Sequence, residues 1–207
     1  MICYYFIMFG LFKNKKKEFA KEIFGTFKPK IDLAKTIGKW EKTSTFGDVF
    51  IDDDYLLGFL NAYVAIVSRK FGYRGKDAGE ISIEVYELLD GTYSDLDKVK
   101  IIFQNYQSAK LSGSKDLILG EDHALMFYLV FTSDNDAHKF SKDPIYKEAI
   151  KYFETGEFKK QSEWAKKILP KELSSGSGLS DAPSNIIVAY RIFEKTFENK
   201  LNKVFKT

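Results

Sequence analysis

The chain has 207 residues, of which 44% are hydrophobic and 29% are charged, a balance typical of a folded domain rather than a disordered chain. Its single cysteine, Cys3, excludes an internal disulfide, and no Cys/His cluster provides a structural zinc site, so a reducing, cytoplasmic location is expected. The net charge of +3 is uneven, because residues 1–42 carry ten lysines against four acidic residues. This asymmetry predicts an anionic partner near the N-terminus, or else a solvated basic arm. The chain has only three arginines, so we do not expect specific recognition of nucleic acid.

The first twelve residues, MICYYFIMFGLF, are almost wholly apolar and lead into the lysine-rich run KNKKK. A secretory signal carries its positive charge before the apolar stretch, and a membrane-spanning helix needs about 20 apolar residues, so neither is expected. Translation could start at Met8, or the segment could lie in a membrane interface with its lysines facing anionic headgroups. A third interpretation docks the apolar side chains on the protein's own core. The predicted membrane or anion contacts are Phe9, Leu11, Phe12, Lys13, Lys15, Lys16 and Lys17.

Residues 15–24 and 29–42 have the composition of short basic helices. We expect the chain to break between them, because Gly25 and Pro29 both disfavour a continuous helix.

The stretch from Tyr55 to Phe71 is apolar nearly all the way round, which predicts a central helix buried among others. Three aspartates, residues 52–54, precede it at a position where carboxylates cap free backbone amides. We interpret them as helix-start residues rather than metal ligands. Gly72 and Gly75 mark the turn that follows.

Two further helices are predicted by capping patterns. DAGE at residues 77–80 has the spacing of a capping box, and Ser94 with Asp97 repeats this kind of start. Residues 112–120 contain two glycines and are expected to form a loop. The next apolar run, residues 124–131, is compatible with a buried strand or a buried helix, and its composition favours the helix.

Asp143 followed by Pro144 predicts the start of a helix that ends at Gly156. A second amphipathic helix, residues 158–169, stops at Pro170.

Within AIKYFETGEFKKQSEWAKKILP, the spacing of Tyr152, Gly156 and Phe158 resembles the turn region of a tetratricopeptide repeat. The resemblance covers some twenty residues once, whereas such solenoids need about three units. It therefore implies a helical hairpin rather than a repeat protein.

The segment SSGSGLSDAPS, residues 174–184, has the composition of a flexible linker. Residues 185–207 are then predicted to form a long amphipathic helix, whose apolar stripe is expected to pack on the protein's own domain rather than on a partner.

Both histidines have acidic neighbours, which raises the alternative of a divalent metal that activates water. Their spacing matches no established helical metal motif, and both clusters fall where helix N-termini are expected, so capping also explains the acids. The chain has no phosphate-binding loop and no hydrolase nucleophile motif. The candidate metal ligands are Glu121, Asp122, His123, Asp134, Asp136 and His138.

These patterns predict an all-α fold: a single bundle-like domain with a basic N-terminal arm and a C-terminal helix after a Ser/Gly linker. The arm covers residues 1–42, the helical core 43–173, the linker 174–184 and the C-terminal helix 185–207. The expected function is that of a non-enzymatic protein–protein interaction or adaptor protein without a cofactor, peripheral at the cytoplasmic membrane face. The alternative is a metal-dependent, hydrolase-like enzyme that uses His123 and His138.

Overall fold

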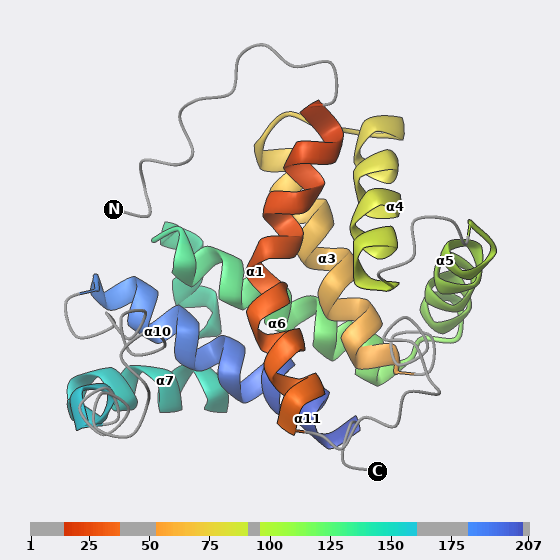
Figure 1. Ribbon diagram of the computed structural model, residues 1–207. Helices are drawn as coiled ribbons and strands as arrows, with labels where there is room; N and C mark the ends of the chain where they lie inside the picture. Colours follow the sequence, from red (N-terminus) through yellow and green to blue (C-terminus); the bar gives the residue numbers. More distant parts are fainter. Residues whose placement is uncertain (1–14, 38–52, 91–95, 161–181, 205–207) are drawn as a thin grey trace.

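The computed structural model describes residues 15–37, 53–90, 96–160 and 182–204. Every regular element in these ranges is helical, so the predicted all-α class is confirmed (Figure 1). No helix within the described ranges is both long enough and apolar enough to cross a bilayer. The elements are α1 (Lys15–Ile37), α3 (Asp54–Lys70), α4 (Lys76–Asp90), α5 (Leu96–Leu111), α6 (Lys115–Phe131), the 3₁₀ helix η2 (Asn135–Phe140), α7 (Pro144–Glu154), α10 (Ser184–Phe193), the π-helical turn η4 (Glu194–Glu198) and α11 (Asn199–Val204).

Helices α3 and α6 cross at the centre of the fold, and each contributes a glycine to the crossing. A Cβ atom on Gly58 would lie 2.3 Å from the carbonyl oxygen of Leu117, and one on Gly120 would lie 2.2 Å from that of Tyr55. Both separations are too short for a real contact. The two backbones therefore approach this closely because neither glycine has a side chain.

The start of α6 differs from the sequence-based prediction. The helix begins at Lys115 with Ser114 as its N-cap, so the expected loop over residues 112–120 is wrong beyond Ser114. Gly120 belongs to the helix, where it serves the crossing with α3 rather than a turn. The apolar run 124–131 forms the second half of α6 and is helical, as its composition favoured.

Helix α1 is continuous from Lys15 to Ile37, so the predicted pair of short helices is wrong. Pro29 lacks the N–H group that would bond to the carbonyl of Gly25, four residues earlier. Gly25 is exposed, so water can solvate that carbonyl and the helix tolerates the proline. The buried face of α1 contributes four side chains to the core: Phe19, Ala20, Ile23 and Phe27.

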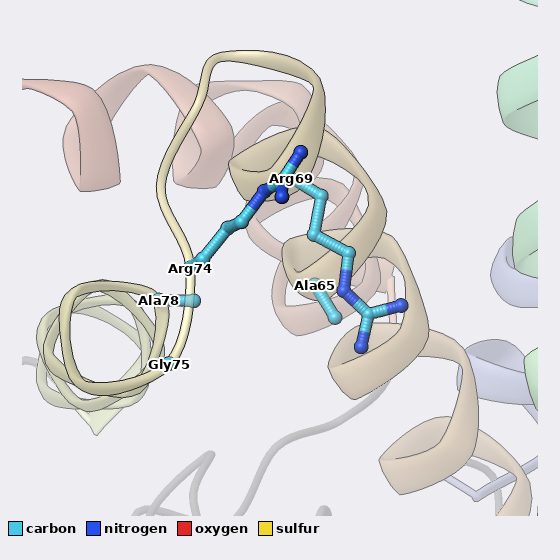
Figure 2. Close-up of a pocket in the computed structure, with 5 residues that line it drawn as sticks. All are labelled: Ala65, Arg69, Arg74, Gly75 and Ala78. Carbon is cyan, nitrogen blue, oxygen red and sulfur yellow. The ribbon is translucent and has the colours of Figure 1, made fainter.

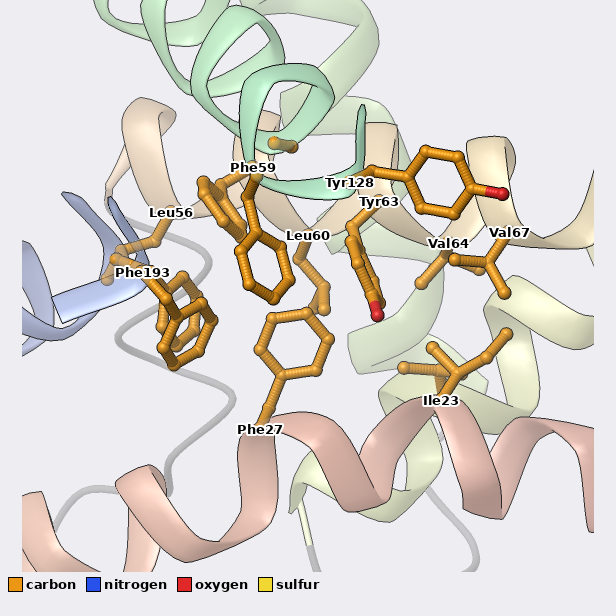
Figure 3. Packing of buried hydrophobic residues seen from close by; sticks show 14 of the residues in the cluster. Ile23, Phe27, Leu56, Phe59, Leu60, Tyr63, Val64, Val67, Tyr128 and Phe193 are labelled. Carbon is orange, nitrogen blue, oxygen red and sulfur yellow. The ribbon is translucent and has the colours of Figure 1, made fainter. Parts of the chain in front are cut away.

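Aromatic rings from distant parts of the chain meet in this core (Figure 3). The ring centroid of Phe27, on α1, lies 5.0 Å from that of Tyr63 on α3 and 5.1 Å from that of Phe197 on η4. Phe127 on α6 lies 5.1 Å from Phe193 on α10. The first described helix and the last helical run therefore share one core, to which such ring pairs contribute beyond their buried area.

Two predicted helix caps are confirmed. The side chain of Asp53 accepts a hydrogen bond from the backbone N–H of Leu56 at 3.0 Å, at the start of α3. Asp143 accepts from the N–H groups of Ile145 at 2.7 Å and Tyr146 at 3.2 Å, and Pro144 occupies the first position of α7.

Several predictions fall outside the described residues. They are the contacts at Phe9, Leu11, Phe12 and Lys13, the helix-start residues Asp52 and Ser94, the second helix of the hairpin beyond residue 160, and linker residues 174–181.

Candidate functional site

The lysines of the predicted contact set that the structure describes begin α1, and two of them face α4. The Lys16 ammonium donates to Asp77 and to Glu80, the latter at 2.6 Å, and these hydrogen bonds raise the pKa of Lys16. The Nζ of Lys17 lies 3.8 Å from a carboxylate oxygen of Glu84. These two lysines therefore tie the start of α1 to α4.

An open pocket with a volume of about 540 Å³ lies where α3 ends and α4 begins. Two of the chain's three arginines line it, Arg69 from the last turn of α3 and Arg74 from the turn before α4 (Figure 2). Its other lining residues are small: Ala65, Gly75 and Ala78. Positive charge therefore borders a space that small side chains leave open.

The turn between α3 and α4, residues 71–75, is held by a glycine cap. Gly72 has a φ of +86°, and its N–H donates to the carbonyl of Arg69 at 3.1 Å, while the N–H of Tyr73 donates to the carbonyl of Ser68 at 2.9 Å. These are the two hydrogen bonds of a Schellman motif. Gly75 also has a positive φ, +53°, directly before α4. The backbone geometry of the turn thus fixes the positions of the Cα atoms of both arginines.

The basic side chains around this turn are not balanced by acids. None of the ion pairs found within the described ranges involves Arg69, Lys70 or Arg74. The side chain of Lys76 is 90% exposed and approaches Glu80 only at 3.8 Å. Lys15, in the first turn of α1, is also exposed. We call this group the basic end; it comprises Lys15, Arg69, Lys70, Arg74 and Lys76.

The start of α1 is fixed against the same turn. The ring of Phe19 packs on Phe71 and on Tyr73, with centroid separations of 5.1 and 5.0 Å. Phe71 remains 46% exposed despite this contact. In Figure 1 the start of α1, the end of α3 and the start of α4 lie at one end of the molecule. An exposed aromatic ring therefore accompanies the basic end.

The two arginines do not form a preassembled clamp. In Figure 2 the guanidinium groups of Arg69 and Arg74 extend in different directions rather than facing one point. A single small anion is bound best when donors converge on it. This arrangement instead suits several anionic groups distributed over a surface.

His123 occupies the middle of α6 and is buried between helices. Its Nδ1 lies 2.8 Å from the hydroxyl oxygen of Tyr55, and its Nε2 lies 3.9 Å from a carboxylate oxygen of Asp143. Burial lowers the pKa of His123 and outweighs the opposing effects of Asp143 and Asp122. The imidazole is therefore neutral at pH 7 and joins α3 to α6.

Four of the five remaining candidate metal ligands, all except Asp122, have other partners among the described residues. Glu121 accepts a hydrogen bond from the hydroxyl of Tyr106 at 2.6 Å, and Asp134 accepts one from the N–H of Asp136 at 2.9 Å as the cap of η2. His138 is exposed on η2.

Within the described ranges, which include all six candidates, no group of three or more His, Cys, Asp or Glu side chains is placed to hold a metal ion. Glu121 and Asp122 do not lie at a helix start, because α6 begins at Lys115. For these two acids the expected capping role is wrong.

The sequence pattern alone does not identify the basic end, because Lys15 is far from its other members in the chain and the pairing of nearby acids is not visible in the sequence. The segment RKFGYRGK, residues 69–76, does carry a signal, since it places four basic residues around two glycines and two aromatic residues. Whether the neighbouring acids Asp77 and Glu80 cancel this charge depends on their pairing with Lys16 of α1, which is visible only in the fold.

Comparison of the chain with protein-family models, with curated proteins and with solved structures gave no match.

Proposed function

We propose that the protein is a non-enzymatic helical adaptor that attaches reversibly to an anionic membrane surface on the cytoplasmic side. The observation that carries this proposal is that the apolar first twelve residues are joined to the fold at the basic end. Three peptide links separate Phe12 from Lys15, so their Cα atoms are at most about 11 Å apart. Apolar and basic contacts are thereby tethered to the same end of the molecule.

Two weak signals of this kind suffice for reversible attachment. Each basic side chain close to an anionic leaflet contributes about 1 kcal/mol, and an apolar segment adds a further term by burying hydrocarbon. Lys16 has a different role in this proposal, because its ammonium pairs with Asp77 and Glu80 and offsets part of their negative charge, which would otherwise repel an anionic surface.

An exposed apolar surface at the other end of α3 supports the adaptor role. It surrounds the turn between α5 and α6, where Leu111 is 89% exposed, Ile118 50% and Leu119 45%. The hydroxyl of Ser114 donates to Asp54 at 2.6 Å, which fixes this turn to the start of α3. A protein partner that binds here would be separated from the membrane contact by the length of α3.

Co-sedimentation with lipid vesicles tests the membrane attachment. Full-length chain should sediment with vesicles that contain phosphatidylserine, remain in solution with pure phosphatidylcholine vesicles, and dissociate as salt is raised. A chain that starts at Met8 tests whether the first seven residues are needed. Full-length chain that ignores the anionic vesicles at low salt would overturn the proposal.

The adaptor role is tested by one double variant in two assays, capture of a protein partner and vesicle binding. The double variant L111S/I118S should lose a protein partner that the wild-type chain captures, while its binding to vesicles stays unchanged. Capture that is equally strong with this variant would contradict a role for the surface around the α5–α6 turn.

A further inference from the structure

We infer that the turn between α3 and α4 is itself a lipid-contact site, in which Phe71 enters the boundary between headgroups and acyl chains while Arg69, Lys70 and Arg74 contact lipid phosphates. This inference rests on the proposed membrane attachment. It assigns the contact to residues of the folded domain, beyond the N-terminal segment that the sequence indicated.

The backbone of the turn presents these side chains in a fixed way. The Schellman hydrogen bonds close α3 directly after Phe71, so Arg69, Lys70 and Phe71 occupy its final turn and cap. One side of the Phe71 ring is supported by Phe19, yet 46% of the residue faces solvent. A half-exposed aromatic ring among cations matches the chemistry of a membrane interface.

The local charges favour an anionic surface. Lys16 holds the acids Asp77 and Glu80 of α4, while Arg69 and Arg74 have no ion-pair partner among the described residues. The positive potential of the turn is therefore not cancelled by the neighbouring helix. Small side chains beside the arginines leave an open pocket of about 540 Å³.

A lipid surface fits better than an acidic peptide or a nucleic acid. The guanidinium groups point in different directions, which suits separate headgroups lying side by side (Figure 2). An exposed phenylalanine lies at this end and the apolar N-terminal segment is joined to the chain there, and neither would gain from contact with a phosphate backbone alone.

The decisive experiment compares two charge-matched double variants of the full-length chain in vesicle co-sedimentation. R69Q/R74Q removes two cations from the turn, and K115Q/K147Q removes two exposed cations from α6 and α7. Each cation near the surface strengthens binding about fivefold, so R69Q/R74Q should bind phosphatidylserine vesicles about 25-fold more weakly than wild type. K115Q/K147Q should change binding by less than about threefold, because these lysines lie outside the contact.

The outcomes separate the inference from the proposed function. Wild-type binding that R69Q/R74Q leaves unchanged, or that both double variants weaken equally, would overturn the contact at the turn and leave membrane attachment intact. Absence of wild-type binding would overturn both.

Phe71→Ser supplies a second, charge-neutral test. It should weaken vesicle binding severalfold while the salt dependence stays that of the wild type, because it removes an apolar contact and no charge. Circular dichroism melting verifies that each variant is folded at the assay temperature. Binding by folded Phe71→Ser at wild-type strength would contradict insertion of the ring.

Competitors distinguish the lipid surface from other anions. Inorganic phosphate should displace the chain no better than a chloride salt of equal ionic strength, and a short DNA duplex should bind more weakly than anionic vesicles. Duplex binding that is as tight as vesicle binding and equally dependent on Arg69 and Arg74 would identify a polyanion site and overturn the lipid assignment.

Discussion

The close approach of α3 and α6 depends on two glycines, because neither has a Cβ atom. At Gly58 and at Gly120, a Cβ would fall within 2.3 Å of a backbone carbonyl oxygen, and backbone cannot move aside as a flexible side chain can. We therefore expect Gly58→Ala and Gly120→Ala each to lower the free energy of unfolding by about 3 kcal/mol, as overpacking of a tight core does. Urea denaturation of the purified variants measures the loss.

Gly79→Ala is the matched control, because a Cβ at Gly79 in α4 would meet nothing within 4 Å. Alanine favours a helix over glycine by about 1 kcal/mol, so this variant should be more stable than wild type. Equal effects of alanine at Gly58 and Gly79 would show that the helix crossing is not tight.

His123 makes stability depend on pH in a defined direction. Burial puts the pKa of His123 in the folded chain below its ordinary value of 6.5, although Asp143 on the α7 side and Asp122 on its own helix act against this. Between the folded and unfolded pKa values the unfolded chain binds more protons, so the free energy of unfolding falls as the pH is lowered through this window. Denaturation midpoints at pH 7.5 and pH 5.5 should show the decrease.

His123→Gln serves as the comparison for this effect. The variant loses the hydrogen bond to Tyr55 and should be less stable at both pH values, but its stability should change less between them. The informative quantity is the change in the free energy of unfolding between the two pH values. An identical change for wild type and His123→Gln would contradict the role given to His123.

For single residues, the sequence predicts a role correctly where the residue contacts others that are close to it in the chain. Asp53 and Asp143 were recognised as caps because a cap bonds to amides two or three residues away. Gly120 was misread as a turn residue because its partner, Tyr55, is distant in sequence. A glycine between apolar residues, as in LLGFL around Gly58, is compatible with a helix crossing, yet nothing local identifies the partner helix.

Among the elements, α1 shows how tertiary packing overrides a strong local signal. Pro29 sits inside the helix and removes one backbone hydrogen bond, but the buried side chains of Phe19, Ile23 and Phe27 hold the helix on the core. Such packing involves residues far away in the chain, so the sequence pattern alone predicted a break.

This conflict predicts a stabilising substitution. Pro29→Ala restores an N–H donor for the carbonyl of Gly25 and removes the clash of the proline ring, so the free energy of unfolding should rise by about 1–3 kcal/mol. The gain is measured by urea denaturation and by increased helical ellipticity. A less stable variant would mean that the distortion at Pro29 is required for the packing of α1.

For the whole molecule, the shared aromatic core predicts one cooperative transition. Phe27 on α1 and Phe197 near the C-terminus are both fully buried, and their rings are in contact. Phe27→Ala and Phe197→Ala should each cost about 3–5 kcal/mol, and the double variant should lose less than the sum, because the two residues share a contact.

Amide hydrogen exchange, measured residue by residue, tests whether the molecule unfolds in one cooperative transition. Amides of α1 and of α10 should exchange with the same opening free energy as those of α3. Early exchange confined to α1 would show that this helix opens independently of the core.

The position of α3 between the α5–α6 turn and the basic end has a geometric consequence for a membrane-bound molecule. Both helices start at the end that carries the α5–α6 turn, and α3 finishes at the basic end, about 25 Å away for a helix of 17 residues. Attachment through the basic end would stand the molecule upright, with Leu111 and Ile118 raised above the headgroups and turned away from the bilayer. Energy transfer from a dye at position 111 to labelled lipids should then report a height of about 25 Å, against near zero for a molecule lying flat.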